Sequence, residues 1–248
     1  MSRLYNAIVI DTEATGINPE VDQVIEVAFQ KLHAHLPAFY SHGGNYSEYT
    51  HELFMPSVPM NLGAQATHNI LMSELRGKPH PSTFKFPEGV DFAIGHNIDF
   101  DLEMLGVMGK VKGICTLALS RFLWPEIDSH KQSAMMYHYA RQSDDPDASE
   151  IAVRSMIKDA HSALCDIWNC RTLLQNLMVT AHNRGYTLLD WNDVYALSEK
   201  ARIPTVMQFG KHQGCLIEHV PRSYVQWYMR EAKQDPYLVK AFKKAGLA

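Results

Sequence analysis

The sequence predicts an α/β protein in which helices cover the faces of a mixed sheet. Three observations support this fold class: apolar, β-branched runs come early in the chain, strand–helix units follow them, and helical periodicity dominates the middle. With 248 residues, 46% of them hydrophobic and 20% charged, the chain can form one full core plus a small appendage. This composition excludes collagen-like, disulfide-dense and wholly disordered proteins.

Five segments predict strands. The first is an apolar run that ends at an acidic residue and a glycine turn, which is typical of a buried strand. The second alternates two sets of side chains, and Pro56 stops the third. The expected strands cover residues 4–10, 23–32, 49–55, 91–94 and 111–115.

The remaining segments predict helices and two long loops. Helical periodicity is expected over 116–123, 130–141 and 162–183, while 33–48 and the acidic stretch 143–150 are expected to be loops. The helical pattern breaks around Arg184-Gly185. We therefore expect a main domain over 1–183, a linker helix over 184–203 and a small basic module over 204–248.

The net charge of −4 hides an uneven distribution along the chain. Residues 200–248 carry nine Lys/Arg and three acids, which gives +6, whereas residues 1–199 carry 14 bases and 24 acids, which gives −10. A basic tail on an acidic body suggests polyanion binding by the tail and cation-dependent chemistry in the body. A chance surplus of solvated lysines is the alternative.

No segment predicts export or membrane insertion. The longest uncharged stretch, between Glu52 and Glu74, contains prolines and polar residues, whereas a bilayer span needs about 20 mainly apolar residues. The N-terminus has no apolar signal core, so we expect a cytoplasmic protein without a membrane partner. The four cysteines lack zinc-finger spacing and are expected to be reduced, structural thiols.

Two acids follow the first predicted strand. Asp11 and Glu13 lie two residues apart, and alternate side chains of a strand share a face, so both carboxylates should point the same way. Neighbouring carboxylates repel unless a cation or a proton lies between them. Taken alone the pair is weak evidence, because most such pairs are solvated loop charges.

Two later acids lie on apolar helix stripes. Asn97 is placed to cap the helix after the fourth strand, and Asp101 falls on the apolar stripe of that helix. Asp166 projects among apolar residues of the long helix that begins at 162. Carboxylates on core-facing stripes are costly unless they are paired or bind a metal. The four acids should therefore converge on a divalent metal, and oxygen-only ligands favour Mg²⁺ or Mn²⁺ over zinc.

His161 lies five residues before Asp166, about 140° away on an ideal helix. It should therefore approach the acids from the loop or the first helical turn. A histidine at the rim of a metal–carboxylate site suits a general base for water, because its pKa lies near the operating pH. Taken alone, His161 is equally consistent with a polar residue that opens a helix.

Three motifs in the chain resemble those of the DEDDh branch of the DEDD (DnaQ-like) exonucleases, and most closely the exonuclease X type. They occur in the family's order and spacing, as DTEATG at 11–16, HNIDFD at 96–101 and HSALCD at 161–166. The resemblance covers residues 4–182 and implies a ribonuclease H-like fold with about five strands. The loops at 33–48 and 143–150 depart from the family pattern and leave the substrate preference open.

The resemblance implies a two-metal mechanism with a histidine base. Asp11 would bridge two ions, while Glu13 and Asp166 would hold the ion nearer the attacking water. Asp101 would support the second ion partly through water, and His161 would deprotonate the attacking water. Two ions about 3.5–4 Å apart would stabilise the attacking and leaving oxygens. The implied product is a nucleoside 5′-monophosphate released from a 3′ end.

Further residues are expected beside the terminal nucleotide. The backbones of Thr12 and Ala14 would hold its sugar, and His68 resembles a loop histidine that the family places near the substrate. Ile17 would either pack on a base or anchor its loop in the core. The expected substrate-binding set is Thr12, Ala14, Thr15, Gly16, Ile17, Asn18, His68, Asn97 and Phe100.

The tail resembles a small F-G-K-x-x-G module found appended to exonuclease X-like proteins. Lys211, Arg222 and Arg230 are the expected phosphate contacts. Phe209 and Trp227 would either stack on bases or pack in a core, and we expect core packing because so small a module needs its aromatic residues.

Together these patterns predict a metal-dependent 3′–5′ exonuclease that acts on single- or double-stranded DNA. An RNA-trimming enzyme or a polymerase-associated proofreading subunit would use the same five catalytic residues. A nucleic-acid-binding adaptor with a vestigial site would lack one of them, and all five are present. The sequence identifies no protein partner.

Overall fold

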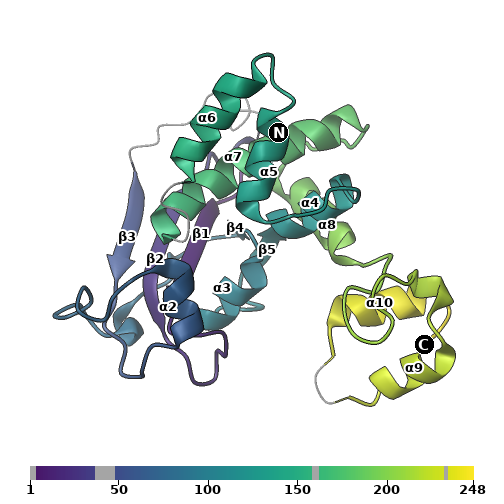
Figure 1. Cartoon of the computed structure of the whole chain (residues 1–248), viewed down its shortest axis with the longest axis horizontal. Helices are drawn as coiled ribbons and strands as arrows, with labels where there is room; N and C mark the ends of the chain where they lie inside the picture. Colours follow the sequence, from purple (N-terminus) through teal and green to yellow (C-terminus); the bar gives the residue numbers. More distant parts are fainter. Residues whose placement is uncertain (1–3, 37–47, 158–161, 232–233) are drawn as a thin grey trace. The chain divides into compact units, whose positions relative to one another are not determined.

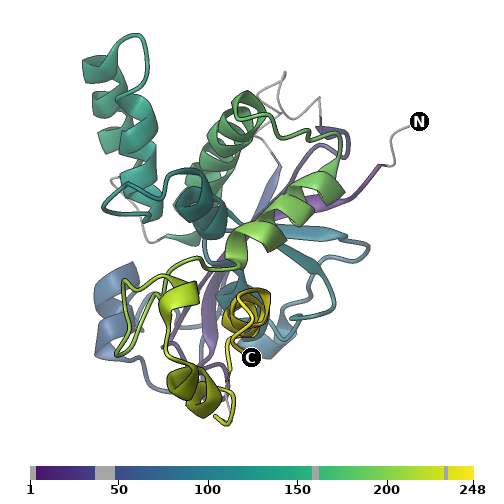
Figure 2. The ribbon, with the colours of Figure 1, turned by 90° about the vertical axis from the view of Figure 1, so that its right-hand side faces the viewer.

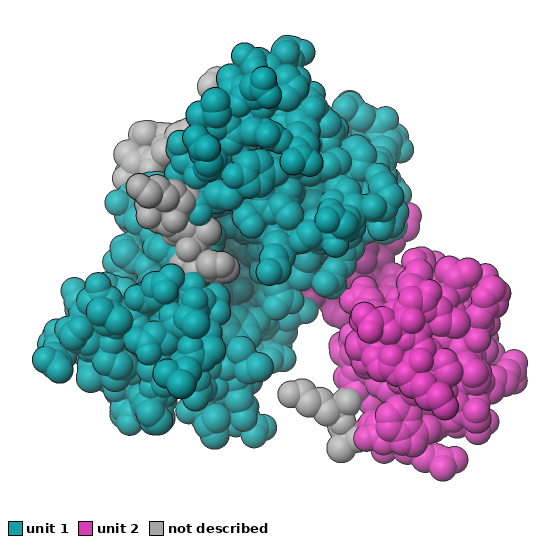
Figure 3. All heavy atoms as spheres, in the orientation of Figure 1, with its two compact units in different colours: residues 1–198 teal, residues 199–248 magenta. Residues whose placement is uncertain are grey.

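The computed structural model describes residues 4–36, 48–157, 162–231 and 234–248. The chain divides into two compact units, Met1–Ser198 (unit 1) and Glu199–Ala248 (unit 2), which Figure 3 distinguishes by colour. Unit 1 contains a five-stranded sheet with helices packed on it (Figure 1). The predicted α/β class and mixed sheet are confirmed.

The sheet has the strand order β3-β2-β1-β4-β5. Its central strand, β1, pairs antiparallel with β2 and parallel with β4. The outer pairs are β2 with β3, antiparallel, and β4 with β5, parallel. The strands are β1 Ala7–Ala14, β2 Val24–Lys31, β3 Tyr49–Leu53, β4 Phe92–Gly95 and β5 Lys112–Cys115.

Strand β1 continues past the point where its parallel neighbour stops. Its pairing with β4 extends only as far as Val9 opposite Ile94, whereas its pairing with β2 passes Glu13 opposite Glu26 and reaches Ala14 opposite Val24 after a register shift. The predicted strand ended before the acids, but the observed one carries them, because β2 supplies hydrogen-bond partners along this stretch. The acids of β1 therefore lie near the carboxyl ends of parallel strands, where α/β sheets commonly bind ligands.

Two helices pack on the strands at the acids, and further helices pack on these in turn. Helix α7 (Ala163–Asn183) packs against β1, β2 and β4, and α3 (Ile98–Met104) packs against β1, β4 and β5. Helices α4 (Thr116–Leu123) and α5 (Gln132–Ala140) pack on α7. Helix α6 (Pro146–Met156) lies beside α5, as Figures 1 and 2 show.

Two local predictions are wrong. The stretch 143–150 was expected to be a loop, but α6 begins within it, because Asp145 accepts a hydrogen bond from the Ala148 backbone N–H at 3.1 Å and Pro146 occupies a first-turn position. Asn97 was expected to cap α3 with its side chain, but it makes no such bond. Its backbone is left-handed, with φ of 79°, a conformation that Asn tolerates. Most of the predicted 33–48 loop lies outside the described residues.

The segment expected to be a linker belongs largely to unit 1. Helix α8 (Trp191–Arg202) buries Trp191 completely, and the indole N–H donates to the His33 carbonyl at 2.9 Å. The Ser198 hydroxyl accepts a hydrogen bond from the Cys115 backbone N–H at 2.9 Å. The boundary between the units falls after Ser198, within the segment 184–203 that was expected to be the linker.

Unit 2 contains α9 (Arg222–Tyr228) and α10 (Pro236–Lys244). Phe209 and Trp227 were expected in its core, but they are 46% and 52% exposed. The inward face of α9 carries Val225 and Tyr228 instead, and helical periodicity turns Trp227 away from them. The buried cluster consists of Met207, Ile217, Val220, Val225, Tyr228, Leu238, Ala241 and Phe242.

None of the helices in the described part of the chain combines the length and apolar character that crossing a membrane requires. The four cysteines are free thiols, with Cys115 and Cys170 buried.

Candidate active site

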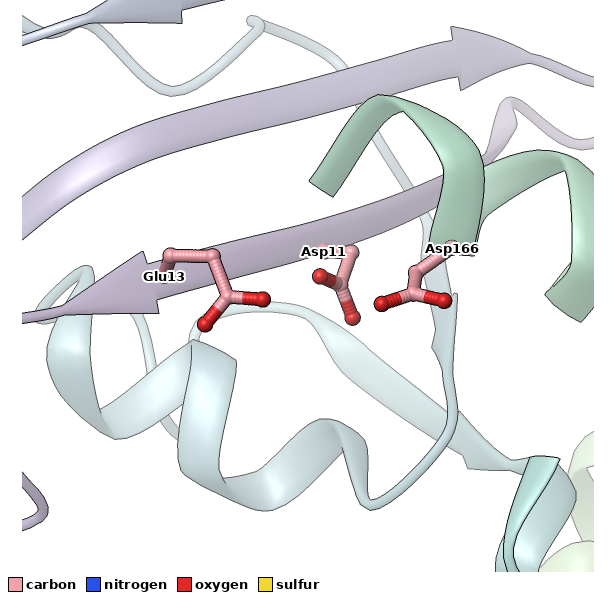
Figure 4. A group of neighbouring side chains, drawn as sticks. All are labelled: Asp11, Glu13 and Asp166. Atoms are coloured by element: carbon pink, nitrogen blue, oxygen red, sulfur yellow. The ribbon is translucent and has the colours of Figure 1, made fainter. Parts of the chain in front are cut away.

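Three predicted site residues come together at the end of β1. Asp11 and Glu13 extend from one face of the strand, and Asp166 extends from the first turn of α7 (Figure 4). One carboxylate oxygen from each lies within 4.8 Å of the others, and all three residues are half-buried. Because these donors are all carboxylate oxygens, the group fits a hard divalent cation such as Mg²⁺ or Mn²⁺.

Asp101 lies next to this group but is held by a separate interaction. It is buried on α3, and its Oδ1 accepts hydrogen bonds from the backbone N–H of Thr12 at 2.9 Å and from the Thr12 hydroxyl at 2.8 Å. The Thr12 backbone N–H is therefore engaged by Asp101, and the sugar contact expected of the Thr12 backbone stays a prediction. Thr12 is buried and positions Asp101.

Burial and mutual repulsion favour the protonated forms of these acids. Burial raises the pKa of Glu13 from its ordinary 4.5 to about 9, and neighbouring carboxylates, led by Asp166, add to the increase. Burial and the negative charge of Asp101 raise the pKa of Asp11 well above its usual range. Burial also raises the pKa of Asp101 to about 7, although the hydrogen bonds from Thr12 oppose the shift. A bound divalent cation would remove this repulsion.

The sequence did not identify Glu26 as part of the site. Glu26 lies opposite Glu13 on β2 and is buried. Its Oε2 accepts a hydrogen bond from the Ala163 backbone N–H at 3.1 Å, and its Oε1 accepts one from the Ser162 hydroxyl at 3.3 Å. Nε2 of His51 lies 2.6 Å from the same Oε1. Glu26 thus ties the start of α7 to the sheet at Ala163, three residues before Asp166.

The sequence around Glu26 contains a pattern from which its structural role could have been predicted. The strand from Val24 to Ala28 has apolar residues on both faces, and a lone acid in such a strand needs partners. Gln132 carried no comparable signal, because polar residues are common at helix starts. Its side-chain amide donates to both the carbonyl and Oδ1 of Asp166, each at 3.1 Å, and so orients that carboxylate.

His96, in the second motif, connects the end of β4 to two neighbouring segments. Its Nδ1 lies 2.9 Å from the Thr116 hydroxyl, and its Nε2 lies 2.9 Å from the His130 carbonyl. Burial lowers the pKa of His96 from 6.5 to about 4. The ring is therefore neutral near pH 7 and supports the segment that leads into α3.

Most of the turn after the first motif is structural. Thr15 is fully buried, and its hydroxyl donates to Asp22 at 3.1 Å and accepts from the Gln23 backbone N–H at 3.0 Å. The predicted substrate contact by Thr15 is wrong, because the residue has no exposed surface. Gly16 is also buried, and a Cβ there would overlap the side chains of Asn61 and Asp22. This close approach explains the glycine.

The exposed part of the turn begins at Ile17, which is 86% exposed. Ile17 therefore does not anchor its loop in the core and has surface available for a base. Asn18 is exposed too, and its backbone N–H donates to Asp22 at 2.9 Å. Ala14 is buried at the end of β1.

The other predicted residues have diverse positions. His68 is buried at the end of α2 (Leu62–His68), and its Nδ1 accepts a hydrogen bond from the Ile70 backbone N–H at 3.0 Å, so it stabilises its own turn. Asn97 is exposed and Phe100 is half-buried. His161 lies outside the described residues, and its role as the base stays a prediction.

The three predicted phosphate contacts are exposed on unit 2. Lys211 lies in the turn between Gly210 and His212, and Arg230 follows α9. Arg222, in the first turn of α9, donates to the Gly246 carbonyl at 3.3 Å.

Two curated proteins are similar in sequence to this chain. It is 27% identical over 179 residues to Exodeoxyribonuclease 10 of Escherichia coli strain K12, across 71% of this chain and 74% of that protein. It is 29% identical over 173 residues to DNA polymerase III PolC-type of Lacticaseibacillus paracasei, across 62% of this chain and 11% of the polymerase. In both comparisons the aligned segment is shorter than this chain.

Two solved structures share the fold. Exonuclease X in complex with 5′ overhanging duplex DNA aligns with a TM-score of 0.54 and 22% identity, over 77% of this chain and 99% of that one. The zinc-bound E. coli ExoI–ssDNA complex aligns with a TM-score of 0.51 and 16% identity, over 74% of this chain and 41% of that one. Unit 1 therefore has the expected ribonuclease H-like fold.

A separate similarity concerns mainly unit 2. Residues 198–236 match a family described as "Putative quorum-sensing-regulated virulence factor". This match assigns no chemistry to the acids of unit 1. The sequence similarity to Exodeoxyribonuclease 10, the shared fold and the cluster of acids together support a DnaQ-like 3′–5′ exonuclease, a type of enzyme that uses divalent metal ions.

Proposed function

We propose that this protein is a 3′–5′ exodeoxyribonuclease that releases nucleoside 5′-monophosphates from DNA. The observation that carries the proposal is the group formed by Asp11, Glu13 and Asp166, whose carboxylate oxygens lie within 4.8 Å of one another. The similarity to Exodeoxyribonuclease 10 of E. coli supports DNA as the substrate. Cytoplasmic location remains part of the proposal.

In the proposed mechanism, Asp11, Glu13 and Asp166 would hold two Mg²⁺ or Mn²⁺ ions, and Asp101 would support one of them. When bound, such ions polarise the scissile phosphate and stabilise the attacking and leaving oxygens. Asp11 lies between Glu13 and Asp166 (Figure 4), so its carboxylate is central to the group that would hold the ions. His161 takes the proton from the attacking water at a ring nitrogen.

Several neighbouring residues position the acids. Thr12 holds Oδ1 of Asp101, which leaves Oδ2 as the oxygen for a water-mediated contact. Gln132 holds one oxygen of Asp166, and Glu26 holds the start of the helix that carries it. Such supporting bonds keep reacting groups in a productive geometry.

The substrate would extend along residues beyond the acids. Exposed Ile17 packs on the terminal base. Asn18, next to it in the chain, and Asn97 and Phe100 of the second motif are further proposed substrate contacts. Lys211, Arg222 and Arg230 contact phosphates farther along the strand, which agrees with the +6 charge of residues 200–248.

The similarity to DNA polymerase III PolC-type favours a second candidate, a proofreading subunit that works with a polymerase. This role predicts weak activity of the isolated chain and copurification with a polymerase. RNA trimming requires the same catalytic residues, so only a direct comparison of substrates separates it from DNA hydrolysis.

The test is a time course on matched DNA and RNA strands labelled at either end, with Mg²⁺ and with a chelator. We expect a ladder of products shortened from the 3′ end of DNA, which the chelator abolishes. Cleavage that starts at the 5′ end, or that persists in the chelator, would contradict the proposal. Asp147→Asn, an exposed substitution on α6, serves as the matched control for changes in the acid cluster.

A further inference from the structure

We propose that unit 2 binds single-stranded nucleic acid by stacking bases on a partly exposed aromatic surface. This aromatic surface consists of His212, Tyr224 and Trp227, with Phe209 in the adjoining turn. The inference rests on the proposed function, because the strand held there would be a nuclease substrate. It adds to the predicted phosphate contacts a second kind of interaction, with the bases.

The rings form a continuous row. The Tyr224 and Trp227 ring centroids lie 5.2 Å apart at an interplanar angle of 48°, and the His212 ring meets Tyr224 edge-on at 4.6 Å. Trp227 at the end of the row is 52% exposed. Single exposed apolar residues are ordinary on protein surfaces, but a row of rings in mutual contact is an organised feature.

A tight turn holds His212 and Phe209 beside the helix. The Met207 N–H donates to the Cys215 carbonyl at 2.8 Å, and the Gly214 N–H donates to the Met207 carbonyl at 2.9 Å. Gly210 and Gly214 have φ of 76° and 83°, which favour glycine. A Cβ at Gly210 would lie 3.1 Å from the Tyr224 hydroxyl, so the turn packs closely on the helix.

The surface is not needed to build the core of unit 2. Trp227, Phe209 and His212 are absent from the buried cluster, whose aromatic members are Tyr228 and Phe242. Tyr224 packs partly against that cluster and supports the exposed rings. About half of the Trp227 surface is thus exposed to solvent, although the ring also contacts Tyr224, and exposed tryptophans are enriched among binding residues.

The charge around the aromatic surface favours nucleic acid as the occupant. Residues 200–248 carry +6, and Lys211 lies within the turn that supplies Phe209 and His212. Arg230 is exposed and lies three residues after Trp227. Single strands offer free base faces and phosphates together, and proteins bind them with aromatic rings in a basic setting. Duplex DNA has its bases stacked on each other, so it offers phosphates and base edges but no free base faces along its length.

The experiment measures binding by the full chain in a chelator, so that no strand is cut. Fluorescence anisotropy follows a labelled oligothymidylate of about 20 nucleotides, the matched oligouridylate and a blunt duplex. We expect Trp227→Ala to weaken binding to both single strands by about tenfold, because one stacking contact is lost. Duplex binding should change by less than about twofold.

Two variants control for folding and for tryptophan content. Trp227→Tyr keeps an aromatic face and should restore most of the affinity. Trp168→Ala removes another exposed tryptophan, which is 40% exposed on α7 beside Tyr49, and should leave affinity unchanged. If Trp227→Tyr binds as weakly as Trp227→Ala, the ring does not act by stacking and the proposal fails.

Other results also overturn the proposal. Unchanged single-strand affinity in a Phe209→Ala/Trp227→Ala double variant, or an equal loss for the duplex, would exclude base stacking. A change of oligomeric state without a change of affinity would assign the surface to protein contacts. Hydrolysis of the p-nitrophenyl ester of thymidine 5′-monophosphate reports the acid cluster separately, so failure of the aromatic surface and failure of the nuclease assignment give different readouts.

Discussion

Carboxylates on the two neighbouring strands β1 and β2 have different surroundings in the fold. Glu26 on β2 has partners for both oxygens, in His51, Ser162 and the Ala163 backbone. Asp11 and Glu13 on β1 have other carboxylates as charged neighbours, and burial raises the pKa of each. The hydrogen bonds of Glu26 stabilise the fold. The repulsion between Asp11, Glu13 and their neighbours destabilises it without metal and favours the binding of a cation. A site that needs a ligand is commonly less stable without it.

The largest expected effect is on activity. Asp11→Asn or Asp166→Asn should lower nucleotide release by about three orders of magnitude or more, because each removes a proposed metal ligand. The measurement is single-turnover release of labelled nucleotide with saturating Mg²⁺. Asp147→Asn should behave like the unmodified protein, and near-normal rates in either acid variant would refute the assignment.

The next effect separates an anchor from a ligand. Glu26→Ala should lower the free energy of unfolding by about 1–3 kcal/mol, since the Ala163 N–H loses its partner. It should also reduce kcat by about 10- to 100-fold, because Asp166 loses its fixed position. Glu26→Gln keeps one acceptor oxygen and should recover part of both losses, as urea unfolding and kcat would show. If Glu26→Ala abolished turnover as fully as Asp11→Asn, Glu26 would belong with the ligands.

Burial of Glu13, together with repulsion by the neighbouring acids, predicts a pH dependence of stability without metal. The pKa of Glu13 is raised to about 9 in the folded protein, whereas the unfolded chain has the ordinary value of 4.5. Between these two pH values the folded protein keeps a proton that the unfolded chain has already lost. Stability should therefore fall as the pH rises through this window. Glu13→Gln should raise the melting temperature in a chelator at pH 7–8 by several degrees. Mg²⁺ should then stabilise the unmodified protein more than Glu13→Gln, and equal shifts would contradict the site.

A smaller effect of opposite sign is expected from His96. Its pKa is lowered to about 4, so the unfolded chain takes up a proton on this ring as the pH falls from 6.5 towards 4, and the folded protein does not. Stability from this residue is present above pH 6.5 and is lost on acidification. Replacing the ring by an amide, His96→Gln, should flatten this acid limb by about 1 kcal/mol in pH-dependent urea unfolding. An unchanged acid limb would mean that the ring titrates normally.

The sequence by itself determined the sheet, the motifs and the acids that lie on them. Strand alternation alone placed Asp11 and Glu13 on one face, and the apolar stripe of α7 alone made Asp166 anomalous. These inferences succeeded because periodicity and motif spacing are local properties, recorded within about ten residues of chain. The five strands follow for the same reason, although β1 proved longer than its apolar run.

Only the tertiary structure decided which groups hold the acids in place. Thr12 and Asp101 are 89 residues apart in sequence, and Glu26 and Ala163 are 137 apart, so no local pattern records either bond. The same holds for the aromatic residues of unit 2, where the sequence favoured Phe209 and Trp227 as core and packing selected Tyr228 and Phe242. The hydrophobicity of a side chain shows that it can be buried. Which of the hydrophobic side chains are buried depends on the packing partners that distant segments of the chain supply.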